Sequence, residues 1–143
     1  MKKEIWFDCD GTIADLYGVD GWLEMLIAED TTPYEVARPL VRMATLARML
    51  NKLQRNGYKI GVISWTSKGG SKEYNERVAR AKKEWLALHL KSVHFDRIDI
   101  VPYGTPKQDG RNGILFDDEI GNREKWNGCA YDVDRIIEIL KSL

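Results

Sequence analysis

The sequence predicts a three-layer α/β/α, Rossmann-like fold with a central, mainly parallel sheet of five strands. Short apolar segments that end in polar clusters alternate along the chain with longer segments of helical periodicity, a pattern typical of strands joined by right-handed helical crossovers. The chain has 143 residues and 43% hydrophobic content, enough for one full core but too little for two ordinary domains. We therefore expect residues 1–143 to form a single domain.

Five apolar segments are expected to form the strands. The first, Lys2 to Phe7, is uniformly apolar from Ile5 onwards, as expected of a buried central strand. The other four segments each lead into polar or glycine-rich sequence, and they lie at residues 59–63, 98–101, 113–116 and 128–131. Because ligands of parallel α/β sheets bind beyond the carboxyl ends of the strands, these polar ends are the expected functional region.

Three amphipathic helices are expected, and the alternation of strands with helices predicts a sheet covered on both sides. They span residues 41–56, residues 72–90 and the segment after Asp132, whose side chain can cap the last helix. The residues expected to be buried are Met43, Leu46, Leu50 and Leu53 in the first helix, Val78, Ala81, Trp85 and Leu88 in the second, and Val133, Ile136, Ile137 and Leu140 in the third.

About residues 16–40 are expected to form a small helical insertion between the first strand and the 41–56 helix. A short amphipathic helix that ends near Asp30 is predicted by apolar residues at helical spacing, namely Val19, Trp22, Leu23, Leu26 and Ile27. A second helix is predicted to begin with Thr32 as its N-cap and Pro33 at its first helical position. Pro39 is expected to end or bend that helix.

The composition argues against several classes of partner. Lysine plus arginine and aspartate plus glutamate both number 22, so no overall field attracts the protein to nucleic acid or to an anionic membrane. Cys9 and Cys129 fall in separate apolar segments, and the sequence shows no secretory leader or apolar run of membrane length. We expect a reduced, cytoplasmic protein that does not bind membranes.

The first strand leads directly into two aspartates, Asp8 and Asp10, followed by Gly11 and Thr12. The two carboxylates crowd one small volume, where they repel each other unless a cation lies between them or one binds a proton. Gly11 allows a sharp turn, and the Thr12 hydroxyl is a candidate substrate ligand. An Asx-type turn would explain the same residues without function, but an apolar strand that leads straight into an acid pair favours an active site.

Further polar clusters follow the later strands. Asp117 and Asp118 follow the strand at residues 113–116, and the hydroxyl and glycine residues that begin with Ser64 follow the strand at residues 59–63. Ser/Thr/Gly clusters are also ordinary loop composition, in which Ser71 is only a helix N-cap. Carboxylates suit a hard divalent cation, and hydroxyls with the ammonium of Lys107 suit an anion that bridges to it. The combination predicts phosphoryl chemistry with Mg²⁺.

In order and spacing, these residues resemble motifs I to IV of the haloacid dehalogenase (HAD) superfamily. The matching residues are Asp8-Cys9-Asp10-Gly11-Thr12, Ser64, Lys107 and Asp117-Asp118. The resemblance implies a HAD-like fold and a Mg²⁺-dependent phosphatase that hydrolyses a phosphomonoester through an aspartyl-phosphate intermediate. Because only about residues 16–40 are available between the first two motifs, it also implies a minimal or absent cap over the site.

The resemblance also implies roles for the four acids. Asp8 would be the nucleophile, and Asp10 would be the general acid and base, with its backbone carbonyl binding Mg²⁺. Asp117 would ligate Mg²⁺ with the assistance of Asp118. Asp8, Asp10, Asp117 and Asp118 are therefore the expected metal ligands.

Two further residues acquire roles from the same resemblance. Ser64 would bind the phosphoryl oxygens, and Lys107 would offset the charge at Asp8. Other basic residues on nearby loops are alternatives to Lys107, namely Lys68, Lys72 and Arg111.

The substrate is expected to be a small phosphorylated compound. The segment from Ser64 to Trp85 is similar to the phosphatase part of phage polynucleotide kinases, which implies a nucleotide or a nucleic-acid end. The aromatic candidates for the rim of the site are Trp22, Tyr34, Trp65 and Tyr103. Trp65 adjoins Ser64, so we predict that it contacts the substrate by stacking on a base.

Two non-enzymatic alternatives remain. A receiver-like signalling module also combines acids, a hydroxyl and a lysine, but it needs an aspartate after the third strand, where this chain has Val101-Pro102-Tyr103. A catalytically inactive phosphate-binding relative would be expected to lack one of the paired acids, and this chain retains them all.

Overall fold

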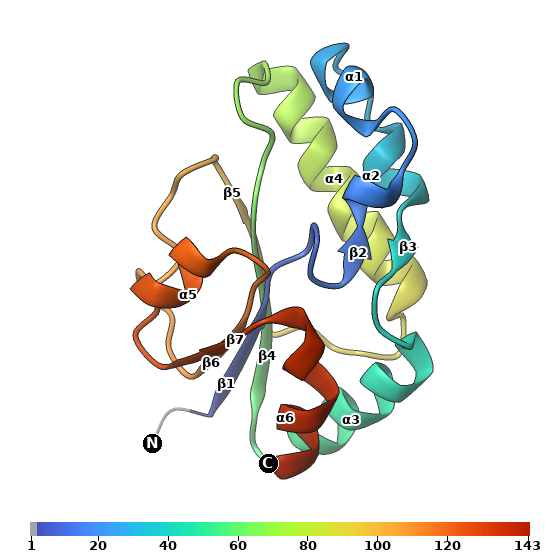
Figure 1. The fold of residues 1–143 in the computed structure, drawn as a ribbon. Coiled ribbons are helices and arrows are strands. Elements are labelled where there is room, and N and C mark those ends of the chain that lie inside the picture. The colour runs from blue at the N-terminus through green and yellow to red at the C-terminus, as the bar shows by residue number, and fades with distance from the viewer. Residues whose placement is uncertain (1–2) are drawn as a thin grey trace.

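Five parallel strands form the central sheet in the order β5-β4-β1-β6-β7 (Figure 1). The structure is a computed structural model that describes residues 3–143. The strands are β1 (Glu4–Phe7), β4 (Lys59–Trp65), β5 (Arg97–Val101), β6 (Ile114–Phe116) and β7 (Cys129–Tyr131). Each predicted strand is present, although Lys2 lies outside the described residues, and the Rossmann-like α/β fold is confirmed.

The β1 strand lies at the centre of the sheet because its side chains are apolar on both faces. Ile5, Trp6 and Phe7 are all buried. Phe7 aligns with Val62 of β4 and with Phe116 of β6. The residues that follow these three parallel strands therefore meet at one edge of the sheet.

The main core lies on the face covered by helices α3 (Met43–Arg55), α4 (Lys72–His89) and α6 (Ile136–Ser142) (Figure 1). A short 3-10 helix, η2 (Val133–Arg135), precedes α6, and the Asp132 carboxylate caps it by accepting a hydrogen bond from the Val133 N–H. The residues predicted to be buried in these helices are buried or half-buried, with one exception.

The exception is Leu88, which is 71% exposed. It lies at the edge of the apolar stripe of α4, close to the end of the helix. The buried side of α4 instead includes Lys82 and Leu86, each of which is only 1% exposed. The prediction of a buried Leu88 was wrong, and the buried lysine bears directly on the site described below.

On the opposite face of the sheet lie the helix α5 (Ile120–Lys125) and the loop that leads from β5 to β6 (Figure 1). A smaller core is present there, made of Trp6, Ile63, Leu115 and Trp126. Gly61 leaves space for the indole of Trp6, because a Cβ at this position would lie 2.6 Å from the ring. The α5 helix was not predicted from the sequence, because none of its residues is buried and it has no apolar periodicity.

Residues 14–40 lie between β1 and α3, and we call them the insert. The insert contains β2 (Ala14–Asp15), the 3-10 helix η1 (Leu16–Gly18), α1 (Trp22–Ile27), α2 (Thr32–Val36) and β3 (Arg38–Pro39). The β2 and β3 strands form a separate antiparallel sheet, and α2 packs against α4. Tyr34 of α2 and Tyr74 of α4 are buried in the small core between the two helices.

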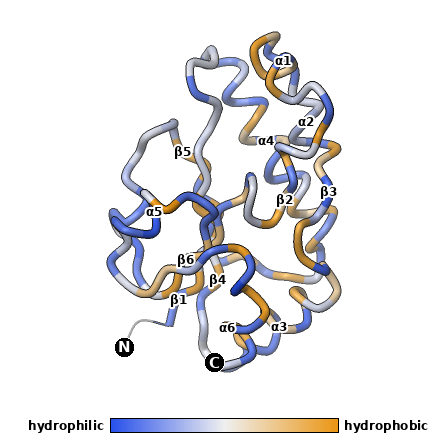
Figure 2. The backbone as a smooth tube through the Cα atoms, in the orientation of Figure 1, coloured by the Kyte–Doolittle hydropathy of each residue, from blue (hydrophilic) through white to orange (hydrophobic). Residues whose placement is uncertain are grey.

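The apolar side of α1 is only partly buried, because Leu26 packs against the small core but other residues of this side do not. Leu23 is 50% exposed and Ile27 is 74% exposed. Both side chains line a pocket at the edge of the sheet, so they face solvent there and not the core. Figure 2 shows hydrophobic residues along α1, at the outer end of the insert.

The boundaries of α2 also differ from the prediction. Thr31 is the N-cap residue in place of Thr32, and its hydroxyl donates to Glu35 Oε2 at 2.9 Å. The helix ends at Val36, before Pro39, because the chain becomes extended there to pair with β2.

Two expectations from the composition concern the cysteines and membranes. Both cysteines are free, with Cys9 buried and Cys129 exposed. Burial, with the added repulsion of Asp10, raises the pKa of the Cys9 thiol, so this thiol stays protonated. Within residues 3–143, no helix combines the length and the apolarity that crossing a membrane requires.

Candidate active site

Three acidic side chains meet at the carboxyl ends of β1 and β6. The Asp8 N–H donates to the Phe116 carbonyl (2.9 Å) and the Asp117 N–H donates to the Tyr131 carbonyl (3.1 Å), so the strand ladders continue one residue beyond β1 and β6. One carboxylate oxygen from each of Asp8, Asp117 and Asp118 lies within 4.8 Å of the others. Two acidic clusters that are far apart in the sequence thus form one group.

The turn after β1 supports this acid group. Gly11 has a φ of 77°, and a Cβ at this position would collide with the Asp118 carboxylate. The Thr12 hydroxyl lies 3.2 Å from Asp8 Oδ2 and 3.3 Å from Asp118 Oδ1, and it accepts a hydrogen bond from the Asp118 N–H. Thr12 is fully buried, so the structure places it behind the acids and not among the pocket residues that face a substrate.

Lys107 is the basic residue in contact with the acid group. Its Nζ lies 3.0 Å from Asp8 Oδ1 and 2.8 Å from Asp117 Oδ2, and the side chain is buried. Burial by itself would lower the pKa of Lys107, but the two carboxylates outweigh this effect and raise it. The alternatives lie elsewhere: Arg111 pairs with Asp99, Lys68 approaches the Tyr103 ring, and Lys72 is exposed on α4.

The Asp10 carboxylate forms a separate ion pair. Lys82 Nζ lies 2.8 Å from Asp10 Oδ2, donates to Ser64 Oγ at 2.8 Å, and donates to the Trp65 carbonyl at 2.6 Å. Lys82 was not among the residues predicted from the sequence. A signal was present, because Lys82 lies four residues after Val78 and three before Trp85, on the buried stripe where a charged residue needs an explanation.

Burial raises the pKa values of three of the acids. The pKa of Asp117 is raised to about 6, by burial first and then by Asp8, against the opposing effect of Lys107. The pKa of Asp118 is raised to about 7 by burial and by Asp8. Burial also raises the pKa of Asp10, although Lys82 opposes this shift. The negative charges of the ionised acids are therefore only partly offset by the neighbouring lysines.

The acid group suits a hard divalent cation. It presents carboxylate oxygens from three residues within 4.8 Å, and oxygen ligands are those that Mg²⁺ prefers. Lys107 supplies only one positive charge against these three acids. The Asp10 carboxylate does not belong to the group, so of the four predicted metal ligands Asp10 could take part only through its backbone carbonyl.

We expect Mg²⁺ to stabilise the protein more at about pH 8 than at about pH 5. At the lower pH, protons occupy Asp117 and Asp118, whose pKa values are about 6 and 7, and compete with the cation. Without bound metal, the raised pKa values of Asp117 and Asp118 stabilise the folded protein at low pH and not at high pH. Their contribution to its stability is fully present below pH 3.8 and is lost as the pH rises through 6 to 7.

The measurement is the melting temperature at both pH values, with and without Mg²⁺. A shift caused by Mg²⁺ that is as large at about pH 5 as at about pH 8 would contradict the assignment of these acids as metal ligands.

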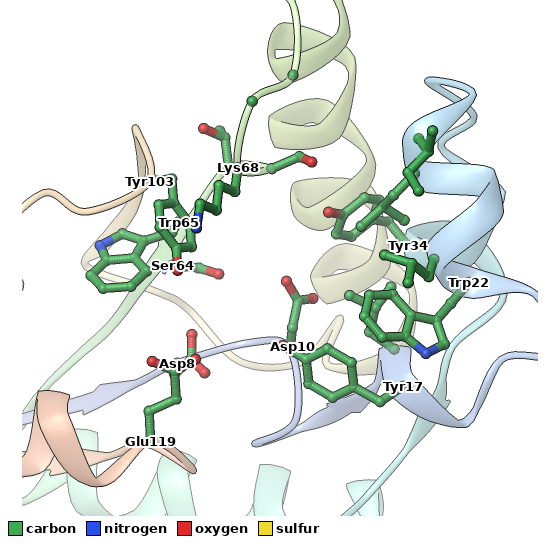
Figure 3. A pocket seen from close by; sticks show the side chains of 18 of the residues that line it. Asp8, Asp10, Tyr17, Trp22, Tyr34, Ser64, Trp65, Lys68, Tyr103 and Glu119 are labelled. Carbon is green, nitrogen blue, oxygen red and sulfur yellow. The ribbon is translucent and has the colours of Figure 1, made fainter.

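Asp8 and Asp10 line a pocket of about 560 Å³ between the sheet edge and the insert. Figure 3 shows Trp65 and Tyr103 on one side of this pocket, Tyr17 and Trp22 on the other, and Asp8 and Asp10 between them. All four predicted rim residues line it, namely Trp22, Tyr34, Trp65 and Tyr103. The Trp65 indole N–H donates to the Thr105 carbonyl at 2.8 Å, and Lys107 Nζ lies 5.0 Å from the centre of its ring.

The glycine-rich segment after β4 forms the wall of the pocket nearest to α4. Ser71 caps α4 by accepting a hydrogen bond from the Tyr74 N–H, so the interpretation of Ser71 as a helix N-cap is confirmed. The Asn75 side chain accepts from the Ser67 N–H and donates to the Gly70 carbonyl, which holds the segment in place. Ser64, at the base of the wall, is only 1% exposed but lines the pocket.

The strand order and the positions of the aspartates correspond to a known architecture. A Rossmann-like sheet in this strand order, with aspartates after its central strand and after a neighbouring strand, is the HAD-like architecture that the motifs implied. Among solved structures, the chain is similar to the D,D-heptose 1,7-bisphosphate phosphatase from Burkholderia thailandensis, with a TM-score of 0.56. The two are 12% identical, and the match covers 99% of this chain and 100% of that chain.

At this level of identity, the similarity establishes the fold alone. No protein-family model matches the chain, and no curated protein matches it. The function of the protein must therefore be inferred from the geometry of the site.

Proposed function

We propose that this protein is a Mg²⁺-dependent phosphatase that hydrolyses a phosphomonoester through an aspartyl-phosphate intermediate. One observation carries the proposal. The two acids of the first motif line the same pocket but have different partners, since Asp8 pairs with Lys107 and Asp10 pairs with Lys82. Two carboxylates in different environments can take different chemical roles, one as nucleophile and the other as acid and base. The HAD-like fold agrees with this interpretation.

In the first step, a carboxylate oxygen of Asp8 attacks phosphorus while the bond from phosphorus to the leaving oxygen breaks. The leaving oxygen takes its proton from Asp10, whose raised pKa favours the protonated form that this step needs. In the second step, water attacks the phosphorus of the aspartyl-phosphate, and Asp10 takes a proton from that water. The bond from phosphorus to Asp8 breaks, which releases phosphate and restores both side chains.

The remaining residues bind and orient the substrate. Lys107, which contacts Asp8 and Asp117, offsets negative charge beside the attacking carboxylate. The Ser64 hydroxyl, which lines the pocket, would bind a phosphoryl oxygen. A Mg²⁺ ion held by Asp8, Asp117 and Asp118 would lower the repulsion between these acids and the substrate.

The insert acts as a minimal cap in this proposal. Tyr17, Trp22 and Leu23 form one side of the pocket, and no second domain is needed to shape it. A volume of about 560 Å³ is in the range of small-molecule sites, and aromatic side chains on both sides suit a planar group. A mononucleotide fits these features better than a nucleic-acid end, because Glu29 and Glu119 also line the pocket and would repel a polyanion.

The direct test is to assay the purified protein against a panel of phosphorylated metabolites, nucleotides and oligonucleotides with 3′- or 5′-phosphates, with and without Mg²⁺. We expect Mg²⁺-dependent release of phosphate, with nucleotides among the preferred substrates. Binding of phosphorylated ligands without turnover in Mg²⁺ would instead support the catalytically inactive alternative. Stable phosphorylation of the protein by a small phosphodonor, without turnover, would support the receiver-like alternative.

If a nucleotide is the substrate, Tyr103→Ala is expected to raise its KM by an amount worth about 1 to 3 kcal/mol, the contribution of one stacked base. The Tyr103 ring is 50% exposed and lies 4.9 Å from the Trp65 ring, so it can be removed without opening the core. KM for p-nitrophenyl phosphate should change little. Trp65→Ala is predicted to raise the nucleotide KM by a similar amount, but it should also affect the aryl phosphate, because Trp65 contacts Lys107.

Equal losses on the nucleotide and the aryl phosphate in Tyr103→Ala would show that the residue supports the phosphate site, and base stacking on this wall would be excluded.

A further inference from the structure

We propose that Lys82 is a positioning residue for the phosphatase reaction. Its ammonium holds the Asp10 carboxylate and the Ser64 hydroxyl in the orientations that proton transfer and phosphate binding require. The inference rests on the proposed function and adds to it a residue that lies on α4, outside the four motifs.

Every N–H donor of the Lys82 ammonium has an oxygen partner. Lysine has three N–H donors, and Lys82 Nζ has three oxygen partners, at Asp10 Oδ2 (2.8 Å), Ser64 Oγ (2.8 Å) and the Trp65 carbonyl (2.6 Å). The side chain is 1% exposed, so it cannot reach a phosphoryl group without losing one of these contacts. Lys82 therefore acts through its partners and not on the substrate.

The first consequence concerns Asp10. An ion pair with Oδ2 fixes the rotation of the carboxylate and leaves Oδ1 as the oxygen for proton transfer. The chain after β1 is a turn and not a strand, so the backbone alone does not determine where this side chain points. Proton transfer requires placement to within a fraction of an ångström, which a fixed ion pair can supply.

The second consequence concerns Ser64. Lys82 donates to Ser64 Oγ, so the hydroxyl hydrogen of Ser64 must point away from the ammonium. Ser64 lines the pocket, and the free hydrogen is thus available to a phosphoryl oxygen bound there. One ammonium therefore orients both a proton donor for the leaving group and a donor for the phosphate.

The insert completes the surroundings of Lys82. The Tyr34 ring, from α2, lies 5.3 Å from Nζ and is itself buried. It covers the ammonium and limits the access of water to the ion pair. If Lys82 served packing alone, its buried charge would destabilise the fold relative to an apolar residue of similar length. The presence of a lysine on the buried side of α4 therefore agrees with a role in the site.

The test is Lys82→Met, which removes the ammonium and keeps the length of the side chain. We compare kcat/KM, which reports the step in which the leaving group departs, for an alkyl phosphomonoester and for p-nitrophenyl phosphate. The alkyl leaving oxygen needs a proton from Asp10, whereas p-nitrophenolate leaves without one. We expect a loss on the order of 10²-fold for the alkyl ester and a loss about tenfold smaller for the aryl ester.

The matched control is Lys83→Met, the next residue of α4, which is exposed and should leave both substrates unaffected. Equal fold losses on the two substrates in Lys82→Met, or no loss, would overturn the proposal. If the wild-type protein hydrolyses neither substrate in Mg²⁺, the proposed function itself fails, which is a different result.

Lys82→Met leaves the Asp10 carboxylate buried without its partner, so the variant can be unstable. The double variant Asp10→Asn/Lys82→Met removes both charges and is compared with Asp10→Asn alone. Because Lys82 acts on proton transfer through Asp10, the second change should cause no further loss specific to the alkyl ester. A further loss specific to the alkyl ester in the double variant would show that Lys82 acts by another route.

Discussion

Replacing Asp8 with asparagine is expected to abolish phosphatase activity. The amide keeps the shape of the side chain but cannot attack phosphorus. Lys107 would retain Asp117 as a partner at 2.8 Å, so the site should keep its geometry. The measurement is turnover of p-nitrophenyl phosphate in Mg²⁺, made after the melting temperature has shown that the variant is folded.

The second acid should behave differently. Asp10→Asn is expected to slow turnover by about 10² to 10⁴, the usual contribution of general acid-base catalysis, because the nucleophile remains. The control is Asp20→Asn, an exposed residue of the insert, which should have wild-type activity. Substantial turnover in Asp8→Asn would mean that the nucleophile lies elsewhere, and equal effects of the two substitutions at positions 8 and 10 would remove the distinction between their roles.

Removal of divalent metal is the second change with a large expected effect. With excess chelator, activity should fall to the background rate, and added Mg²⁺ should restore it. Asp8, Asp117 and Asp118 lie within 4.8 Å of one another, and the phosphomonoester of the proposed reaction would approach Asp8 as a dianion. Lys107 alone does not offset these charges, so without a cation the substrate is repelled from the nucleophile.

The control for this experiment is chelator that has been saturated with Mg²⁺ beforehand, which should not inhibit. It separates loss of the metal from direct effects of the chelator on the protein. Equal rates in Mg²⁺ and in excess free chelator would rule out the metal-assisted mechanism, whatever the effects of the aspartate substitutions.

The strands and the main helices could be predicted from the sequence because their signals are local. The Ile5-Trp6-Phe7 run shows that β1 is buried on both faces, and the spacing of Leu46, Leu50 and Leu53 defines the inner side of α3. Parallel strands place their carboxyl ends at one edge of the sheet. The meeting of Asp8 and Asp117 therefore followed from topology, without any knowledge of side-chain contacts.

The details of the insert were less predictable. Leu23 and Ile27 recur at helical spacing, but spacing shows only that the residues share a side of α1, and it does not show whether that side meets the core or a pocket. The small sheet of β2 and β3 involves only residues 14–15 and 38–39, too few for any periodic signal.

The sequence by itself determined the fold class, the edge of the sheet where the acids gather, and the residue types available there. The motif resemblance implied that Lys107 lies beside Asp8, but only the tertiary structure showed that Lys107 also contacts Asp117 and that Lys82 pairs with Asp10. Lys82 is 72 residues from Asp10, and a lysine on an apolar stripe has no local pattern that names its partner. Ion pairing depends on which side chains the packing of distant elements brings within a few ångströms, and that distance is not encoded in any single stretch of the chain.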